Sequence, residues 1–215
     1  RMAKIERSTL VKCKYIFGQT DWDRRVSQIL APNSLYWRLD RIIRSEFYQY
    51  EWSYRSNKNF IIFTINSNHF YKGFETLCLS LNELNNIGFN CEWHVAGISE
   101  DDLIVKVVKK KIKNKFPNHN LKLLGNLNEK ELTEKLLDSN LFIMTSHIEN
   151  ESNALYEAMI LGLPCISTFV GGTGSTIEDG YNGILIQDGD PYAMAGAILE
   201  LHNDKEKTIL LGQNA

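Results

Sequence analysis

Short apolar runs alternate with longer segments of helical periodicity along most of the chain. FIIFTI (60–65) is apolar at nearly every position, which indicates a strand buried on both faces. In the segment 73–88, apolar residues recur three or four positions apart, as expected for one face of a helix. The strands expected on this basis are 60–65, 91–97, 121–125, 141–146, 164–169 and 183–186, and the helices are 73–88, 101–116, 128–139, 153–162 and 190–202.

Strands that are apolar on both faces need helices on both sides, so the pattern predicts an α/β fold with a doubly wound, mostly parallel sheet. Two helix starts support it, because Asn128 is a suitable N-cap and Asp190 precedes a proline at the first helical position. Ligands bind such sheets at the carboxyl ends of the strands, so the loops there are the candidates for function.

Residues 1–59 show a different pattern. CKYIFGQTDWDRRVSQILAPNSLYW predicts a strand, a helix and a short strand, and the aromatic, polar stretch RSEFYQYEWSYRSNKNF is typical of a connector. We therefore expect 1–59 to be the end of one domain plus a linker, and 60–215 to be a second domain. The first residue, Arg1, and a helical pattern that continues to the last residues lead us to expect a fragment or a processed chain.

Composition narrows the class of protein only slightly. The 215 residues are 43% apolar and 23% charged with a net charge of −2, which is ordinary for a globular protein and gives no field that would attract nucleic acid. No apolar run reaches the roughly 18 residues of a membrane span, and no secretory signal is recognisable, so we expect a cytoplasmic protein. The four cysteines and five histidines lack metal-ligand spacing, and reduced, buried thiols are expected.

The loop NSNHFYKGF (66–74) follows the first strand of the sheet and ends with Lys72 and Gly73 at a helix start. Free backbone N–H groups, the helix dipole and an ammonium group together favour an anion such as phosphate. The alternative is a solvated lysine beside a glycine turn.

The loop IENESN (148–153) lies between a strand and the helix ALYEAMILG. Backbone N–H groups at the start of that helix are free to bind a ligand at the same edge of the sheet. Glu149 precedes the helix and Glu157 lies about one turn inside it. A pair of acceptors placed in this way suits ribose hydroxyls. The alternative is that Glu149 and Glu151 only favour the positive helix end and that Glu157 points to solvent.

Two further loops carry weaker patterns. VGGTGSTIEDGYNG (170–183) contains Gly171 and Gly172, which would allow a ligand to approach the backbone closely; a flexible surface loop is the alternative. DWD (21–23) matches a metal-binding DxD pattern, but we expect Asp21 to act as a helix N-cap instead.

The helix expected at 101–116 carries many lysines. Four of them share one face by spacing, namely Lys106, Lys109, Lys110 and Lys113. A solvated helix face is the main interpretation, and weak contact with an anionic membrane surface is the alternative.

The stretch ENESNALYEAMILGLPCISTFVGGTGSTIEDGYNGILI resembles the retaining GT-B glycosyltransferases of family 4, also called glycosyl transferases group 1. Members carry two glutamates eight positions apart, then EAM, Gly-x-Pro, Gly-Gly and I-x-D-G-x-x-G-x-L, and Glu149 and Glu157 match the two acids. YKGFETL and DGDPYAMAGAI extend the resemblance to about residues 60–213, and GQTDWDRR is similar to the end of the N-terminal domain in polysaccharide-type members.

The resemblance implies two Rossmann-like domains, with 60–215 as the nucleotide-sugar-binding domain, 1–59 as the end of the acceptor domain, and no metal requirement. Lys72 would neutralise the donor diphosphate, Glu157 would bind the ribose, and Glu149 would lie near the donor sugar and the reacting centre. Phosphate oxygens would meet the helix start at Ser152, Asn153, Ala154 and Leu155, and Gly125, Asn126 and Leu127 would contact the base. The remaining donor contacts would come from Ser67, Asn68, Gly171, Gly172 and Thr173.

This sequence departs from the family pattern at three places. Asn66-Ser67-Asn68 replaces the usual Gly-Arg before the lysine, so a diphosphate-binding arginine is missing. Either another cation compensates, for example one from the other domain, or the donor binds more weakly. Asn150-Glu151-Ser152 replaces Gly-Phe-Gly, and Gly174-Ser175 replaces Pro-Glu.

The function implied is transfer of a sugar from a nucleoside diphosphate sugar to a hydroxyl of a glycan or lipid-linked acceptor with retention, in polysaccharide or glycoconjugate synthesis. We expect the chain to be inactive as an isolated fragment. No nucleophile is evident, so the resemblance implies a front-face route. Two alternatives stay open: a GT-B-fold UDP-sugar epimerase and a catalytically inactive nucleotide-binding module.

Overall fold

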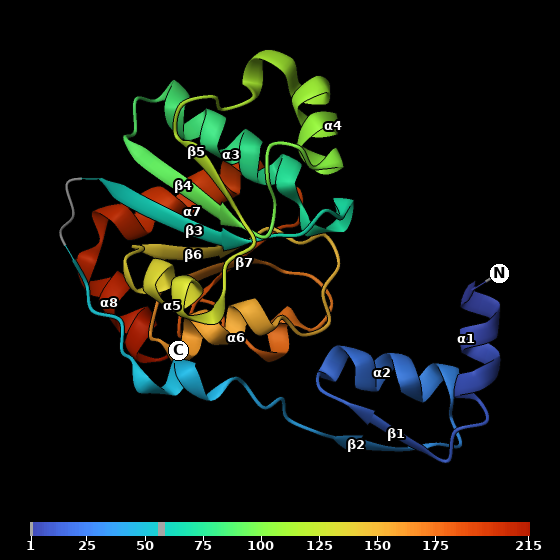
Figure 1. The fold of residues 1–215 in the computed structure, drawn as a ribbon. Coiled ribbons are helices and arrows are strands. Elements are labelled where there is room, and N and C mark those ends of the chain that lie inside the picture. The colour runs from blue at the N-terminus through green and yellow to red at the C-terminus, as the bar shows by residue number, and fades with distance from the viewer. Residues whose placement is uncertain (1, 56–58) are drawn as a thin grey trace.

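The computed structural model describes residues 2–55 and 59–215, which form a large α/β unit and a smaller N-terminal unit (Figure 1). The large unit contains a sheet of order β5-β4-β3-β6-β7-β8, and every pairing in it is parallel. Its strands are β3 (Phe60–Ile65), β4 (Cys91–Ala96), β5 (Leu121–Gly125), β6 (Leu141–Met144), β7 (Cys165–Thr168) and β8 (Ile184–Ile186). Its helices are α3 (Phe74–Asn86), α4 (Leu103–Ile112), α5 (Glu129–Leu137), α6 (Asn153–Ile160), α7 (Pro191–Asn203) and α8 (Lys205–Gln213).

Helices cover both faces of this sheet, which confirms the doubly wound fold. Ile62 and Phe63 are neighbours in β3 and are both fully buried, but they belong to different core clusters. The cluster around Ile62 includes residues of α3, α4 and α7, and that around Phe63 includes residues of α5 and α6. A strand buried on both faces explains why the apolar runs are continuous rather than alternating.

The strand order reverses between β3 and β6. From β3 the chain proceeds outward to β4 and β5, and from β6 it proceeds in the other direction to β7 and β8. In open parallel sheets a crevice forms at the carboxyl ends of the two strands where the order reverses. The loops after Ile65 and Met144 therefore flank the expected binding position.

The stretch predicted to be a connector is anchored to the face of the sheet that α5 and α6 cover, as far as the structure describes it. Phe47, in the 3-10 helix η1 (Ser45–Gln49), is fully buried in that core. The indole N–H of Trp52 donates to the carbonyl of Ser139 at 2.7 Å. The backbone N–H of Trp52 donates to the carbonyl of Leu161 at 2.6 Å. The segment before η1 is therefore fixed beside the sheet. Part of the predicted connector, 56–58, lies outside the described residues.

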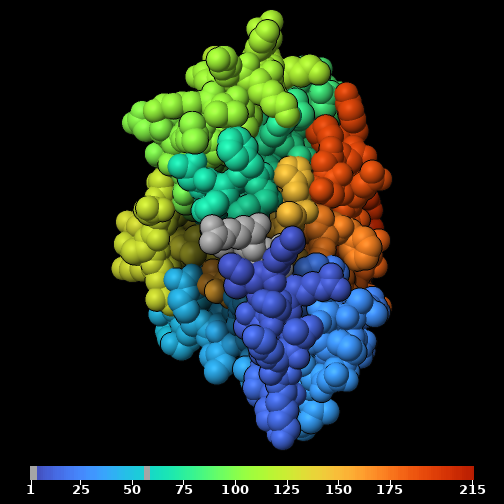
Figure 2. Space-filling model, turned by 90° about the vertical axis from the view of Figure 1, so that its right-hand side faces the viewer, coloured from blue at the N-terminus to red at the C-terminus, as the bar shows by residue number. Residues whose placement is uncertain are grey.

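The N-terminal unit consists of α1 (Met2–Leu10), β1 (Tyr15–Gly18), α2 (Asp21–Leu30) and β2 (Leu35–Arg38), with β1 and β2 parallel. The predicted strand, helix and strand are present, and α1 precedes them. Figure 2 shows the unit across the lower part of the face toward which the strands of the large sheet point.

The N-cap expected at Asp21 was placed one residue too late. Thr20 is the N-cap of α2, since its hydroxyl accepts from the N–H of Asp23 at 3.2 Å. The Asp23 side chain bonds back to the N–H of Thr20, which completes a capping box. Asn128 and Asp190 are N-caps as predicted.

The lysine-rich helix is shorter than predicted. Helix α4 ends at Ile112, because Lys113 has a φ of 49° and begins a 3-10 turn, so Lys113 does not extend the helical face. The buried side of α4 is formed by Ile104, Val105 and Val108. Among residues 2–55 and 59–215, no helix combines the length and the apolar character that a membrane span requires.

Candidate functional site

Lys72 lies at the end of a short 3-10 helix, immediately before the start of α3. Gly73 links the two helices with a φ of 70°, and a Cβ there would lie 1.7 Å from the carbonyl oxygen of Thr145. The carbonyl of Lys72 accepts hydrogen bonds from Asn66 Nδ2 at 3.3 Å and from Thr145 Oγ1 at 3.0 Å. The backbone that carries the lysine is thereby fixed against the loop after β6.

Lys72 and Glu149 form an ion pair, with 2.6 Å between Nζ and Oε2. Their side chains are 23% and 14% exposed, so the pair is largely shielded from solvent but still reachable. The hydroxyl of Ser146 lies 3.5 Å from the same carboxylate oxygen. The structure therefore brings together Lys72, which was predicted to neutralise the diphosphate, and Glu149, which was predicted to lie at the reacting centre.

Glu157 is buried, with a side chain only 7% exposed, and it pairs with Arg44. Arg44 donates from Nε at 3.1 Å and from Nη2 at 2.7 Å, and its guanidinium lies 4.9 Å from the ring centre of Phe47. Burial raises the pKa of the Glu157 carboxyl above its usual value, and the hydrogen bonds and charge of Arg44 offset part of that rise. The carboxylate is accordingly held in place by a residue of the connector.

Arg41, three residues before Arg44 in the segment after β2, lies at the amino end of α6. Its Nε donates to Glu151 Oε2 at 3.0 Å, its Nη2 donates to Gln19 at 3.0 Å, and its Nη1 donates to Asn153 Oδ1. Glu151 also accepts a bond from the hydroxyl of Tyr156 at 2.8 Å. Arg41 is thus held by side chains from α6, from the loop before it and from the N-terminal unit.

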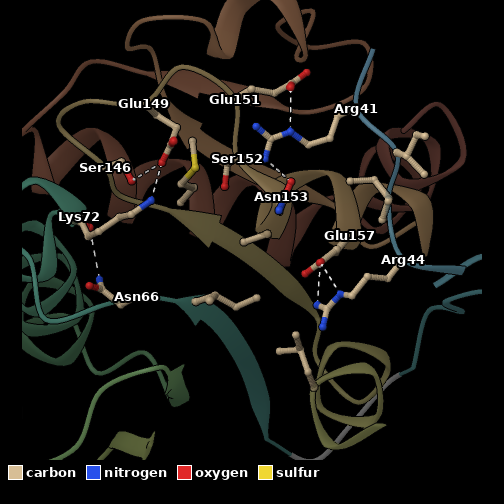
Figure 3. Close-up of a pocket in the computed structure, with 16 residues that line it drawn as sticks. Arg41, Arg44, Asn66, Lys72, Ser146, Glu149, Glu151, Ser152, Asn153 and Glu157 are labelled. Carbon is tan, nitrogen blue, oxygen red and sulfur yellow. Dashed lines mark hydrogen bonds and ion pairs between the residues drawn. The ribbon is translucent and has the colours of Figure 1, made fainter. Parts of the chain in front are cut away.

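These groups line one cavity of about 400 Å³, located where the strand order reverses (Figure 3). Six predicted site residues line it, namely Lys72, Glu149, Ser152, Asn153, Ala154 and Glu157. The other lining residues are Arg41, Ile42, Ile43, Arg44, Ile65, Asn66, Leu132, Met144, Ser146 and Glu151. Three cations and three carboxylates therefore meet at the wall of the cavity, and each cation pairs with a different one of these carboxylates.

The amino end of α6 offers fewer free N–H groups than expected. Ser152 is the N-cap, and its hydroxyl accepts from the N–H of Leu155 at 3.4 Å. The side chain of Leu155 is buried and does not line the cavity. Of the four predicted phosphate-binding positions, Ser152, Asn153 and Ala154 line the cavity.

The Gly-Gly pair contacts the loop that carries Glu149. A Cβ on Gly171 would lie 1.9 Å from the carbonyl oxygen of Glu149, and one on Gly172 would lie 2.1 Å from that of Asn150. The N–H of Gly172 also donates to the Glu149 carbonyl at 3.1 Å. Here the two glycines permit close packing of two loops of the protein, so in this structure they support the position of Glu149.

Other predicted donor contacts lie away from the cavity. The side-chain oxygen of Asn68 accepts from the N–H of Ile104 in the first turn of α4, and Ser67 bonds to His69. The residues predicted to contact the base, Gly125, Asn126 and Leu127, do not line the cavity, nor does Thr173. Both backbone groups of Gly125 are bonded already, to the loop that follows β4. Donor binding by these residues stays a prediction.

The carboxylate of Asp23 in the DxD pattern has a structural role. It accepts from the N–H groups of Gln19 and Thr20, from Asn150 and from the hydroxyl of Tyr36. Burial acts to raise its pKa, but these hydrogen bonds outweigh burial and lower it. In the described part of the chain, no group of three or more His, Cys, Asp or Glu side chains is arranged to hold a metal ion.

Sequence reasoning did not identify Arg41 and Arg44 as part of the site. Both arginines follow β2 in a segment without regular secondary structure, and each bonds to residues more than a hundred positions away. Their spacing of three residues, just before the aromatic Phe47, was the only local signal.

A parallel sheet with its order reversed beside a charged cavity defines a Rossmann-like α/β domain. Residues 49–215 match the family model described as glycosyl transferases group 1, and the chain belongs to this family. An uncharacterized glycosyltransferase of Methanocaldococcus jannaschii is 34% identical over 108 residues, which is 49% of this chain and 31% of that protein.

Solved structures agree with the fold. Sucrose-phosphate synthase from Thermosynechococcus elongatus superposes with a TM-score of 0.85 at 16% identity, over 98% of this chain and 54% of that one. HepE of Anabaena, solved in complex with UDP and glucose, gives a TM-score of 0.76 at 18% identity, over 94% of this chain and 56% of that one. The chain therefore has a Rossmann-like α/β domain of the GT-B type and spans about half the length of these two neighbours.

Proposed function

We propose that the chain forms the donor-binding side of a retaining family 4 glycosyltransferase, with a nucleoside diphosphate sugar as donor. The observation that carries the proposal is the meeting of Lys72, Glu157 and the amino end of α6 in one cavity at the reversal of strand order. The family and the relative named above are glycosyltransferases, which favours sugar transfer over the epimerase interpretation.

The diphosphate would lie between Lys72 and the start of α6. Backbone N–H groups at Asn153 and Ala154, the helix dipole and the ammonium group all favour an anion there. Because negative charge grows on the diphosphate as the bond to the sugar breaks, the same groups would lower the barrier to its departure. Lys72 would then exchange part of its contact with Glu149 for a phosphate oxygen.

The ribose would bind at Glu157. Arg44 occupies only Oε1 of this carboxylate, and none of the described residues donates to Oε2. The second oxygen is therefore available at the cavity to accept a ribose hydroxyl, and a charged acceptor makes a stronger hydrogen bond than a neutral one.

Glu149 would lie near the donor sugar, at the reacting centre. In the proposed front-face reaction, the bond between the anomeric carbon and the diphosphate oxygen breaks while the acceptor oxygen attacks the same face. The departing diphosphate takes the acceptor proton, and the configuration is retained. We propose that the reaction is independent of metal and that the acceptor is a glycan or a lipid-linked sugar in polysaccharide or glycoconjugate synthesis.

We also propose a cytoplasmic enzyme in which Lys106, Lys109 and Lys110 on the exposed side of α4 meet the inner membrane surface. Vesicle sedimentation with and without anionic lipid tests this part separately. Equal, negligible binding to both vesicle types would exclude the membrane contact and leave the donor-binding proposal unchanged.

Two assays test the proposal. Calorimetry with UDP, GDP and ADP on this chain tests binding, with Lys72→Ala as the comparison. Sugar transfer is then measured with a protein that joins this chain to a complete acceptor domain, as wild type, Lys72→Ala and Glu149→Gln. We expect a loss of at least tenfold in transfer for both variants. Wild-type rates in both would exclude the assigned roles, and no binding of any nucleotide would exclude the donor site.

A further inference from the structure

The family resemblance assigns neither Arg41 nor Arg44, and of these two cavity cations Arg41 is the one that bonds to the first residue of α6. We propose that Arg41, from the segment after β2, is the second cation that binds the donor diphosphate, opposite Lys72. The inference rests on the proposed function and adds a specific binding residue to it.

A second cation is needed because Lys72 supplies a single charge, which Glu149 already neutralises in large part at 2.6 Å. The loop that precedes Lys72 offers no further charge. The Asn66 amide bonds to the carbonyl of Lys72 and to the N–H of Ser67, while the amide oxygen of Asn68 bonds to α4. The two ionised phosphoryl groups of a donor therefore require positive charge from another part of the molecule.

Arg41 lies where an anion would bind. Its guanidinium bonds to Asn153, the first residue of α6, and Figure 3 shows it and Lys72 on opposite sides of Ser152. A cation at a helix amino end is unfavourable by itself, because the dipole is positive there. An anion bound between Arg41, the free N–H groups and Lys72 would interact favourably with all three.

Glu151 holds Arg41 in this position. Its side chain is 2% exposed, and both of its oxygens are occupied, one by Arg41 and one by the hydroxyl of Tyr156. Because Glu151 is almost fully buried and both of its oxygens are bonded within the protein, this carboxylate compensates and orients the arginine. Arg41 itself remains 29% exposed, and its three bonds leave two of the five guanidinium N–H groups for phosphate oxygens.

Arg44 is placed for a different role. It bonds to Glu157, lies 3.9 Å from Glu129 and stacks on Phe47, and so belongs to the ribose end of the cavity. The two arginines of one segment thus act on different parts of the donor: Arg41 binds the diphosphate, and Arg44 positions the ribose-binding carboxylate.

The test is calorimetry with inorganic diphosphate, a probe without base or sugar, and with UDP. Arg41→Gln removes the charge, Arg41→Lys retains it, and Arg41→Gln/Glu151→Gln removes both partners, so that no buried carboxylate is left unpaired. Arg38→Gln is the matched control, because Arg38 lies three residues earlier and pairs with Asp40 in solvent, outside the cavity.

We expect diphosphate affinity to fall at least tenfold in Arg41→Gln and in the double variant, to recover in part in Arg41→Lys, and to stay unchanged in Arg38→Gln. Wild-type diphosphate affinity in the double variant would overturn the inference, since it would show that Arg41 only neutralises Glu151. If the double variant Arg41→Gln/Glu151→Gln also binds UDP as tightly as the wild type, the proposed donor site is retained but Arg41 is not part of it. If the wild-type chain binds neither probe, the proposed function itself fails.

Discussion

Arg44 donates both of its hydrogen bonds to the same oxygen of Glu157, from Nε at 3.1 Å and from Nη2 at 2.7 Å. The arginine comes from the segment between the two units and the glutamate from the core side of α6, so their contact joins two distant parts of the chain at the cavity. A buried carboxylate is costly unless it is paired, and this pairing leaves Oε2 without a donor from the described residues.

Replacing Glu157 by Gln tests the ribose role. The substitution keeps the size of the side chain but removes the charged acceptor, and a hydrogen bond to a charged group contributes about 1.5–3 kcal/mol. We expect UDP affinity to fall by roughly ten- to a hundredfold by calorimetry, in line with that energy. Inorganic diphosphate lacks the ribose, so its affinity should not decrease; an equal loss for both probes would contradict the assignment.

The pH dependence of UDP binding follows from the raised pKa of Glu157. Burial lifts this pKa above the ordinary 4.5, so the carboxylate is protonated, and ribose binding weakened, at a higher pH than for an exposed glutamate. Arg44→Gln removes the contributions that lower the pKa, and the acid loss of affinity should therefore move to higher pH. Calorimetry at a series of acid pH values measures this loss of UDP affinity, and Glu157→Gln should not show it. If the acid loss of UDP affinity occurs at the same pH in Arg44→Gln as in the wild type, a group other than Glu157 causes it.

Gly73 tests how Lys72 is positioned. Ala at this position combines a φ of 70° with a Cβ placed 1.7 Å from a backbone oxygen, so the loop after β6 or the start of α3 must move. We expect Gly73→Ala to lower the free energy of unfolding by more than about 2 kcal/mol. Gly88→Ala is the control, with a φ of 74° but open space around the Cβ, and should cost only about 1 kcal/mol. Chemical denaturation compares the two; equal costs would show that the contact with Thr145 is relieved easily.

Replacing Phe47 by Ala tests whether the position of Arg44 depends on the buried Phe47 side chain. It is fully buried on the α5 and α6 side of the sheet, and truncation of a buried Phe to Ala typically costs about 3–5 kcal/mol. We expect Phe47→Ala to destabilise the chain and also to weaken UDP binding, because Arg44 stacks on that ring. Tyr48→Ala is the neighbouring control, since Tyr48 is 64% exposed. A destabilised Phe47→Ala variant with intact UDP affinity at low temperature would separate the anchor from the site.

The sheet and one side of the cavity could be predicted from the sequence because their signals are local. Strands buried on both faces give continuous apolar runs, and Lys72, Glu149 and Glu157 follow such strands at the carboxyl edge of the sheet. Arg41 and Arg44 could not be found in this way, because their contacts depend on how the segment after β2 packs against the large unit. The end of α4 at Ile112 was missed because the positive φ of the following Lys113 has no marker in the sequence.

The most direct test of the central claim is a crystal structure of this chain with UDP, or with GDP or ADP if calorimetry selects one of them. We predict the diphosphate between Lys72, Arg41 and the amino end of α6, with a ribose hydroxyl on Glu157 Oε2. A nucleotide bound elsewhere, or one in this cavity with its ribose away from Glu157, would contradict the account.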